Sequence, residues 1–299
     1  MFATRRAFLV TLMSTASAAL ADASNVELAS YYERHMALID GVAHGWTGRG
    51  APRRLLPAVQ QVGVGKEDWF ALRDDAALLR WRDRAEEAAV LMRGVTRFAA
   101  GATGWFAIDR ESVLWHGGST PTRIAADVVD ACIGDSADYV VQRDGTLLVK
   151  GLAHRGQYGD GRLTATPGFV ATASDAVAVR AHTGHAIYLA RDGTVMGTGG
   201  NRFGPLSSHG LGDKADRWGP IFDRAVAIAT GSAHSLAIRR DGSLWAWGAG
   251  FAIEPRRLMD RVRAAAAGDK ATLARDRDGV LWQWDSGVGP RRLEPGGRW

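Results

Sequence analysis

The sequence predicts an all-β protein, a seven-bladed β-propeller built from antiparallel four-stranded blades. Two observations support this fold. One pattern of strand, glycine turn, strand, Asp-Gly turn and strand recurs along the chain, as is typical of propeller repeats. The chain also contains 37 glycines and 11 tryptophans, which suits many tight turns between short strands.

The clearest copy of the pattern spans residues 226–248. Gly231 separates its first two strands, and the pair Asp241-Gly242 supplies the positive φ angles of a tight hairpin turn. The acidic turn position occurs seven times, at intervals of 35, 36, 33, 48, 49 and 37 residues: Asp40, Asp75, Glu111, Asp144, Asp192, Asp241 and Asp278. The seven copies therefore predict seven blades.

The apolar runs around these turns do not alternate with polar residues. Such runs are expected when both faces of a strand are buried, as they are between stacked blades. Residues 26–29 align with residues 226–229, so we expect residues 26–29 to join the ring rather than form a tail. The propeller is expected to span residues 24–299 as one domain.

The first 23 residues are expected to be an export signal outside the fold. Thr4-Arg5-Arg6-Ala7-Phe8-Leu9 resembles the twin-arginine export motif, and an apolar stretch followed by small residues continues to Ala23. A general secretory signal is the alternative. Both predict a periplasmic or secreted protein, and the apolar stretch is too short for a membrane span.

Composition limits the classes of function. Hydrophobic residues make up 46% of the chain and charged residues 23%, which is ordinary for a globular protein. The net charge of +5 is mildly basic and does not predict nucleic-acid binding. Cys132 is the only cysteine, so an intrachain disulfide is excluded.

Three segments carry a family resemblance. Residues 231–237 and 241–248 resemble the repeat signature of the regulator of chromosome condensation family, and residues 156–161 resemble its Gly-Gln-Leu-Gly turn. The resemblance implies a seven-bladed propeller, here in an exported bacterial member. It does not imply one activity, because the nuclear members act on a small GTPase and chromatin, which an exported protein does not meet.

Catalytic and metal sites are not indicated by the sequence. His185 and His234 occupy one repeat position, which favours structural hydrogen bonds, and His182 near His185 lacks an evident third metal ligand. Ser232 lies in a strand–turn–strand repeat rather than in a nucleophile elbow. Cys132 aligns with a small strand position and is expected in the core. We expect no cofactor, no metal and no enzymatic activity.

Tryptophan marks one repeat position, six residues after the acidic turn residue. It occurs there in four copies that are consecutive in a closed ring, which we call the tryptophan arc: Trp46, Trp81, Trp247 and Trp284. A second set lies two residues earlier: Trp115, Trp245 and Trp282. We predict that the arc binds a partner through partly exposed rings on one side of the propeller, with blade packing as the alternative.

Arginine pairs follow blades of the same arc. The members predicted to bind a partner are Arg256, Arg257, Arg291 and Arg292, with a similar pair at Arg53 and Arg54. Aromatic and arginine side chains together are typical of binding interfaces, although a solvated strand face is the alternative. The long connections 152–176 and 201–225 are further candidates, because long loops on a rigid scaffold often carry function.

These observations favour an exported, monomeric propeller that binds a macromolecular partner, most simply a protein. Carbohydrate or cell-wall binding is one alternative, since exposed tryptophan faces stack on sugars. A propeller-based lyase or hydrolase is another, and it would need convergent polar residues on one face of the ring.

Overall fold

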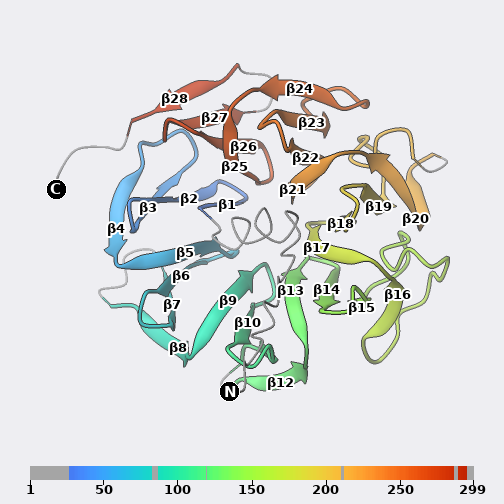
Figure 1. Ribbon diagram of the computed structural model, residues 1–299, viewed down its shortest axis with the longest axis horizontal. Coiled ribbons are helices and arrows are strands. Elements are labelled where there is room, and N and C mark those ends of the chain that lie inside the picture. Colours follow the sequence, from blue (N-terminus) through green and yellow to red (C-terminus); the bar gives the residue numbers. More distant parts are fainter. Residues whose placement is uncertain (1–26, 83–86, 119, 210–211, 286–288, 295–299) are drawn as a thin grey trace, which may run out of the picture.

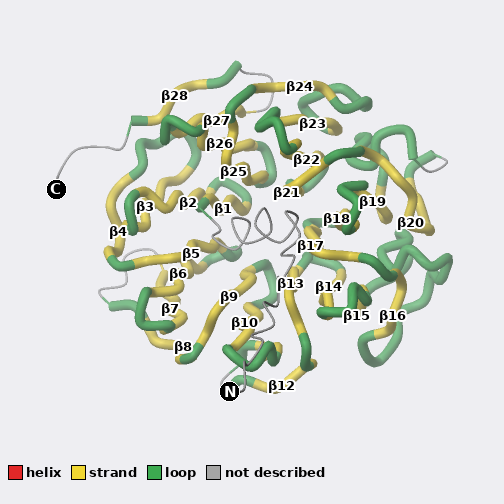
Figure 2. The backbone as a smooth tube through the Cα atoms, in the orientation of Figure 1, coloured by secondary structure: helices red, strands yellow, loops and turns green. Residues whose placement is uncertain are grey.

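The computed structural model describes residues 27–82, 87–118, 120–209, 212–285 and 289–294. It shows seven four-stranded antiparallel sheets arranged around a central axis (Figure 1). All regular structure in these residues is β-strand, and the rest is turn or loop (Figure 2). The predicted seven-bladed propeller is therefore confirmed.

Each blade is one continuous segment in which consecutive strands pair. The strands of blades 1 to 3 are β1 (Leu28–Tyr31), β2 (Arg34–Ile39), β3 (Val42–Thr47) and β4 (Arg53–Pro57); β5 (Val59–Val64), β6 (Asp68–Arg73), β7 (Ala77–Arg82) and β8 (Ala89–Arg93); β9 (Val95–Ala100), β10 (Trp105–Asp109), β11 (Leu114–His116) and β12 (Thr122–Ala125). Those of blades 4 and 5 are β13 (Val128–Ile133), β14 (Ala137–Gln142), β15 (Leu147–Gly151) and β16 (Val170–Ala173); β17 (Ala176–Ala181), β18 (His185–Ala190), β19 (Val195–Gly200) and β20 (Lys214–Phe222). Those of blades 6 and 7 are β21 (Ala225–Thr230), β22 (His234–Arg239), β23 (Leu244–Gly248) and β24 (Arg256–Met259); β25 (Val262–Ala267), β26 (Ala271–Asp276), β27 (Leu281–Asp285) and β28 (Arg291–Leu293).

The hydrophobic core is divided among the junctions between blades. Seven clusters of buried residues lie one at each junction, including the junction of blades 7 and 1. Each blade is thus covered on both faces, which explains the continuous apolar runs in its strands. Close packing also fixes residue size, because a Cβ atom on Gly231 would lie 2.2 Å from the carbonyl oxygen of Gly268 in the next blade.

The predicted Asp-Gly turns connect the second and third strands, but their backbone differs from the expectation. Both turn residues have positive φ only in blade 1, at Asp40 (50°) and Gly41 (74°). In blade 6 only Gly242 does, and the carboxylate of Asp241 accepts a hydrogen bond from the amide of Ser243 at 2.8 Å. In blades 2, 4, 5 and 6 the aspartate stabilises the turn through its side chain, which accepts a hydrogen bond from the amide two residues later, rather than through its own φ angle.

The ring closes without exchange of strands between its first and last blades. Trp46 Nε1 in blade 1 donates to Gln283 Oε1 in blade 7 at 3.1 Å. Arg275 Nη1 in blade 7 donates to the carbonyl oxygen of Leu38 at 2.8 Å and lies 3.4 Å from the carboxylate of Glu27. Side chains and apolar packing therefore fasten this junction.

The predicted start of the ring is confirmed where the structure describes it. Leu28–Tyr31 forms β1, the innermost strand of blade 1, and the carbonyl oxygen of Glu27 accepts a hydrogen bond from the amide of Leu38 at 2.7 Å. The predicted export signal, residues 1–23, lies outside the described residues. In the part that is described, no helix is long and apolar enough to cross a membrane.

Candidate functional site

The tryptophan arc is packing rather than an exposed surface at three of its four positions. The exposed fractions are 4% for Trp46, 0% for Trp247 and 8% for Trp284, and Trp81 is partly buried against the core between blades 1 and 2. The expected exposure of Trp46, Trp247 and Trp284 is therefore wrong. The physical reason is that this repeat position faces a neighbouring blade, where a large ring fills the junction.

The same repeat position fastens the loop of the preceding blade. Trp247 Nε1 in blade 6 donates to the carbonyl oxygen of Pro205 in blade 5 at 2.8 Å. Thr198, the equivalent residue of blade 5, donates through Oγ1 to the carbonyl oxygen of Gly156 in blade 4 at 2.8 Å. The two accepting residues, Gly156 and Pro205, lie in the long connections 152–176 and 201–225 that the sequence marks as candidates.

The predicted arginines lie on the rim of the ring. Arg256 and Arg257 lie on β24, and Arg291 and Arg292 on β28, which are the outermost strands of blades 6 and 7 (Figure 1). Arg257 is ion-paired with Asp260, and Arg292 with Glu294 at 2.8 Å. Arg291 is partly buried and donates through Nη2 to Gln283 Oε1 at 2.9 Å.

The arginines are cross-strand neighbours of the second tryptophan set rather than of the arc. Trp245 pairs with Arg257 and Trp282 with Arg292 in the strand register, and Trp115 pairs with Arg123 in the same way. The three rings are half-buried. Mixed aromatic and basic side chains thus occur on the outer part of blades 3, 6 and 7.

The long loops of blades 4, 5 and 6 gather at one end of the ring, which we call the loop face. Residues 152–169, 201–213 and 249–255 connect the third and fourth strands of these blades. They begin beside the turns between the first and second strands, since the amide of Leu152 donates to the carbonyl oxygen of Ser136 at 2.8 Å, and that of Ala249 to Ala233 at 2.9 Å.

The loop face carries the two most exposed large hydrophobic side chains of the described chain. Ile253 is 60% exposed and Phe203 57%, and Leu152 is 50% exposed. The loops of blades 5 and 6 touch, because a Cβ atom on Gly204 would lie 3.2 Å from Ile253 Cγ1. Three consecutive blades therefore present apolar side chains on one face.

Side-chain hydrogen bonds fasten the described backbone of the blade 4 and blade 5 loops. The Asn201 side chain accepts from the amide of Leu206 at 2.9 Å and donates to the carbonyl oxygens of Ser207 at 3.1 Å and His209 at 3.0 Å. In blade 4, the buried Tyr158 hydroxyl donates to the carbonyl oxygen of Gly151 at 3.1 Å and accepts from the amide of Thr166 at 3.2 Å. The loops present their side chains on a preformed backbone, which lowers the ordering cost of binding.

Basic side chains flank the apolar ones. The Arg202 guanidinium lies 5.6 Å from the centre of the Phe203 ring, and Arg155 approaches the blade 5 turn at Gly184. Neither Arg155 nor Arg202 forms an ion pair with a described residue. The loop face therefore offers both apolar contact and positive charge.

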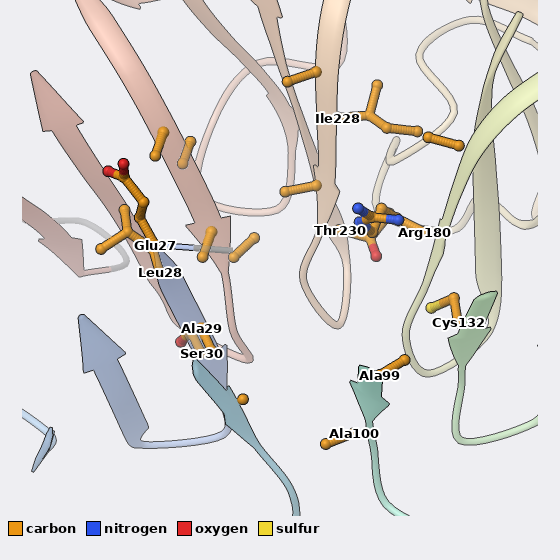
Figure 3. A pocket seen from close by; sticks show the side chains of 18 of the residues that line it. Glu27, Leu28, Ala29, Ser30, Ala99, Ala100, Cys132, Arg180, Ile228 and Thr230 are labelled. Atoms are coloured by element: carbon orange, nitrogen blue, oxygen red, sulfur yellow. The ribbon is translucent and has the colours of Figure 1, made fainter. Parts of the chain in front are cut away.

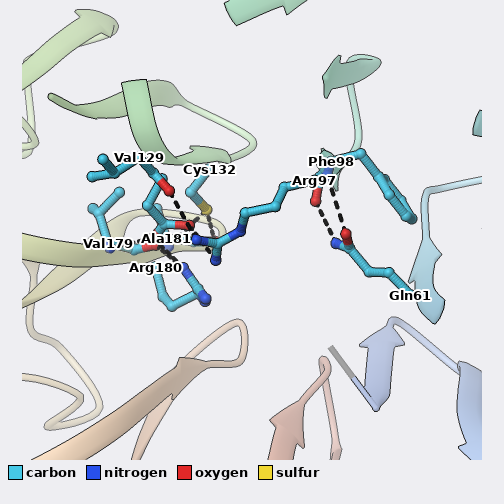
Figure 4. A network of polar contacts seen from close by, with 9 residues as sticks. Gln61, Arg97, Phe98, Val129, Cys132, Val179, Arg180 and Ala181 are labelled. Carbon is cyan, nitrogen blue, oxygen red and sulfur yellow. Dashed lines mark hydrogen bonds and ion pairs between the residues drawn. The ribbon is translucent and has the colours of Figure 1, made fainter. Parts of the chain in front are cut away.

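The centre of the ring contains a cavity of about 260 Å³, lined by the innermost strands (Figure 3). Side chains bridge neighbouring blades along its wall. Gln61 exchanges hydrogen bonds with the backbone of Phe98, and Arg97 Nη1 donates to the carbonyl oxygen of Val129 at 2.8 Å (Figure 4). These bonds satisfy backbone groups at the inner edges of the sheets.

Comparisons with known proteins match this architecture. The chain matches the Regulator of chromosome condensation (RCC1) repeat over residues 225–251. This chain is an RCC1-like β-propeller. A comparison with curated protein sequences finds no match.

Solved structures resemble the RCC1-like propeller in fold. Prp20p from Saccharomyces cerevisiae, studied for its binding to Gsp1p and histones, is 15% identical with a TM-score of 0.70, and the match covers 83% of this chain and 81% of that one. A structure of Kap60 bound to yeast RCC1 (Prp20) gives 16% identity and a TM-score of 0.71, covering 83% and 77%. The ectodomain of the Arabidopsis thaliana receptor kinase ACR4 gives 14% identity and a TM-score of 0.59, covering 91% and 98%.

The repeated histidines of the RCC1-like propeller make structural hydrogen bonds, as predicted, and these bonds connect neighbouring blades. His185 Nε2 lies 3.1 Å from Ser235 Oγ of blade 6, and His234 Nε2 lies 3.0 Å from Thr272 Oγ1 of blade 7. Burial lowers the pKa of His185 to about 3 and that of His234 to about 4. These side chains act as neutral hydrogen-bonding groups between blades.

Cys132 of the RCC1-like propeller lies on β13 beside the central cavity. Its thiol accepts a hydrogen bond from the amide of Ala181 at 3.2 Å, and burial raises its pKa to about 11. The protonated thiol is a weak nucleophile, which agrees with a packing role. No group of three or more metal-ligating side chains occurs among the described residues.

Proposed function

We propose that this RCC1-like propeller is an exported, non-enzymatic, monomeric protein that binds a protein partner through the loop face of blades 4 to 6. One observation carries the proposal. Phe203 and Ile253 are more than half exposed on adjoining loops, and Leu152 is half exposed on the next blade. Large exposed apolar side chains grouped on one face typically mark an interaction site.

The geometry of the loops supports a binding role. The Asn201 and Tyr158 hydrogen bonds fix the loop backbones, so a partner meets a preformed surface and little ordering entropy is lost. Arg155 and Arg202 favour a partner with acidic residues around an apolar centre, and they raise its association rate at low salt. Burial of three of the four arc tryptophans removes the support for carbohydrate stacking.

The predicted arginines on the rim are a secondary part of the proposed binding surface. Arg256 and Arg257 are exposed on β24, next to the end of the blade 6 loop at residue 255. A partner that covers Ile253 and extends to the rim would reach them. Arg291 and Arg292 lie one blade further, on β28.

Export is supported by the sequence of residues 1–23. Cell fractionation with N-terminal sequencing is expected to give a mature chain that begins near residue 24 in the exported fraction. Changing Arg5 and Arg6 to Lys is expected to block a twin-arginine route and to spare a general secretory route. A full-length chain confined to the cytoplasm would contradict export.

The binding proposal is tested by affinity capture from periplasmic extract with paired variants. The unmodified protein is expected to retain a specific protein that F203A/I253D does not retain. The control V90D changes a side chain that is 48% exposed on β8, away from the loop face, and is expected to retain the same protein. Equal capture by F203A/I253D, with unchanged melting temperatures, would place the interaction elsewhere.

A further inference from the structure

The central cavity ends against a side chain that reaches across the ring. Tyr31 belongs to blade 1, yet its hydroxyl donates to Asp135 Oδ1 of blade 4 at 2.6 Å, and its ring stacks on His182 of blade 5 with centres 4.9 Å apart. These blades are not neighbours of blade 1 in the ring. Tyr31 therefore spans the channel at the end of the loop face and gives the cavity a floor.

Positive charge exceeds negative charge on the cavity wall. The charged residues that line it are three arginines and two carboxylates: Arg97, Arg180, Arg263, Glu27 and Asp130. Asp130 contacts both Arg97, at 3.3 Å, and Arg180, at 2.7 Å. Glu27 is ion-paired with Arg263 and also lies 3.4 Å from Arg275. Each carboxylate is thus shared by two guanidinium groups.

Arg180 has donors to spare at the cavity. Its Nη1 donates to Asp130 and to the carbonyl oxygen of Val179, and its other N–H groups donate to no described residue. A guanidinium group has five N–H donors in a planar fork that fits a carboxylate. The side chain is 28% exposed and lines the cavity (Figure 3).

The floor contains one buried polar atom without a hydrogen-bond partner in the described chain. His182 Nε2 is buried and makes no hydrogen bond with a described residue, whereas Nδ1 lies 3.0 Å from Thr183 Oγ1. Burial lowers the pKa of His182, so the ring is neutral near pH 7. Arg180 and His182 are two residues apart on one strand and its end, about 7 Å along the chain.

The rest of the wall is small and apolar. Alanine occupies lining positions in six of the seven innermost strands: Ala29, Ala99, Ala131, Ala178, Ala227 and Ala265. Their short side chains leave room beside the arginines, and an apolar body placed there loses contact with water. The cavity of about 260 Å³ is large enough for a compact ring or a short hydrocarbon chain.

We propose that this cavity binds a small organic acid, with its carboxylate on the guanidinium group of Arg180 and its apolar body against the alanines, next to the floor formed by Tyr31 and His182. The site is separate from the loop face and does not depend on the proposed protein partner.

Benzoate is the probe, because it combines a carboxylate with a compact apolar ring. Calorimetric titration of the unmodified protein is expected to show saturable binding of benzoate at least about tenfold tighter than that of benzamide, its neutral isostere. Inorganic phosphate and acetate, which lack the apolar body, are expected to bind more weakly than benzoate. Equal affinities for benzoate and benzamide, or for benzoate and acetate, would overturn the proposal, as would the absence of saturable benzoate binding.

Substitution at the guanidinium locates the site. R180Q is expected to weaken benzoate binding at least about tenfold, and R180K, which keeps the charge, to restore part of it. R191Q is the control, since Arg191 is exposed and paired with Asp175 on the surface. Benzoate is also expected to shift the ring resonances of His182 in the NMR spectrum, and benzamide is not. Unchanged binding in a folded R180Q protein, or unperturbed His182 resonances, would refute the assignment.

Discussion

Trp247 Nε1 donates a hydrogen bond of 2.8 Å to the carbonyl oxygen of Pro205, forty-two residues earlier in the chain and one blade away. Ser235 Oγ donates to the same carbonyl oxygen at 2.9 Å. Blade 6 therefore fixes the loop of blade 5 that presents Phe203. The sequence marks Trp247 as a possible binding anchor, but in the structure Trp247 positions the neighbouring loop of blade 5.

The first prediction concerns this bond. W247F keeps most of the ring and removes the donor, so it is expected to lower the free energy of unfolding by about 1–3 kcal/mol. W247A also opens a cavity and is expected to cost about 3–5 kcal/mol. Urea denaturation measures both.

Hydrogen exchange separates a local effect from a global one. In W247F, the amides of Leu206 and Ser207 are expected to exchange faster than in the unmodified protein, while W245F, whose indole bonds only to Ser243 of its own blade, leaves them unchanged. Slow exchange of both amides in W247F would mean that the loop is held by other contacts.

The second prediction concerns closure of the ring. R275M removes the donor to Leu38 and one partner of Glu27 at a buried junction, so it is expected to destabilise the protein by about 2–4 kcal/mol. R261M breaks the exposed pair of Arg261 with Asp278, and a change below about 1 kcal/mol is expected. Similar losses in the two variants, measured by urea denaturation, would show that the closing contacts contribute no more than surface pairs.

The third prediction concerns pH. His185 and His234 have folded pKa values of about 3 and about 4, lower than the ordinary histidine pKa of 6.5. The unfolded chain therefore binds more protons between pH 6.5 and 4, and the free energy of unfolding falls as the pH falls, by up to about 1.4 kcal/mol per pH unit for each histidine. H234Q is expected to be less stable at pH 7 but to lose less stability between pH 7 and 5.

Denaturation curves at pH 7, 6 and 5 measure this slope. The control is H154Q, since His154 is exposed on the blade 4 loop, and its slope is expected to match that of the unmodified protein. An unchanged slope in H234Q would show that His234 is protonated to the same extent in the folded and unfolded chains.

The fourth prediction concerns turn residues that are not glycine. Ala76 and Ser112 occupy the turn position that is Gly242 in blade 6, and they have φ angles of 62° and 61°. A side chain is unfavourable in this region, so A76G is expected to raise the free energy of unfolding by about 1 kcal/mol. A77G, one residue later on the buried strand β7, is expected to lower it. A destabilised A76G protein would contradict this account.

The blades could be predicted from the sequence because an acidic residue recurs at the same turn position in all seven copies. Asp241 and its equivalents mark the hairpins, and the apolar runs indicate burial on both faces. The exposure of the arc could not be predicted, because the repeat gives the place of Trp247 within its blade but not the neighbouring loop that covers it. The candidate loops of blades 4 and 5 had a usable signal, namely the extra length of copies four and five, whereas the blade 6 loop had none. The contact of Tyr31 with Asp135 had none, since it joins blades that are adjacent neither in the chain nor in the ring.

Because every blade is one uninterrupted segment, the ring has no privileged first blade. All 28 strands would keep their hydrogen-bonded neighbours if the chain were opened at a connection between two blades and its present ends were joined. Circular permutants are therefore expected to fold, each with a different junction held only by side chains. For the same reason, one blade could be duplicated or replaced as a unit without changing the pairing of any strand.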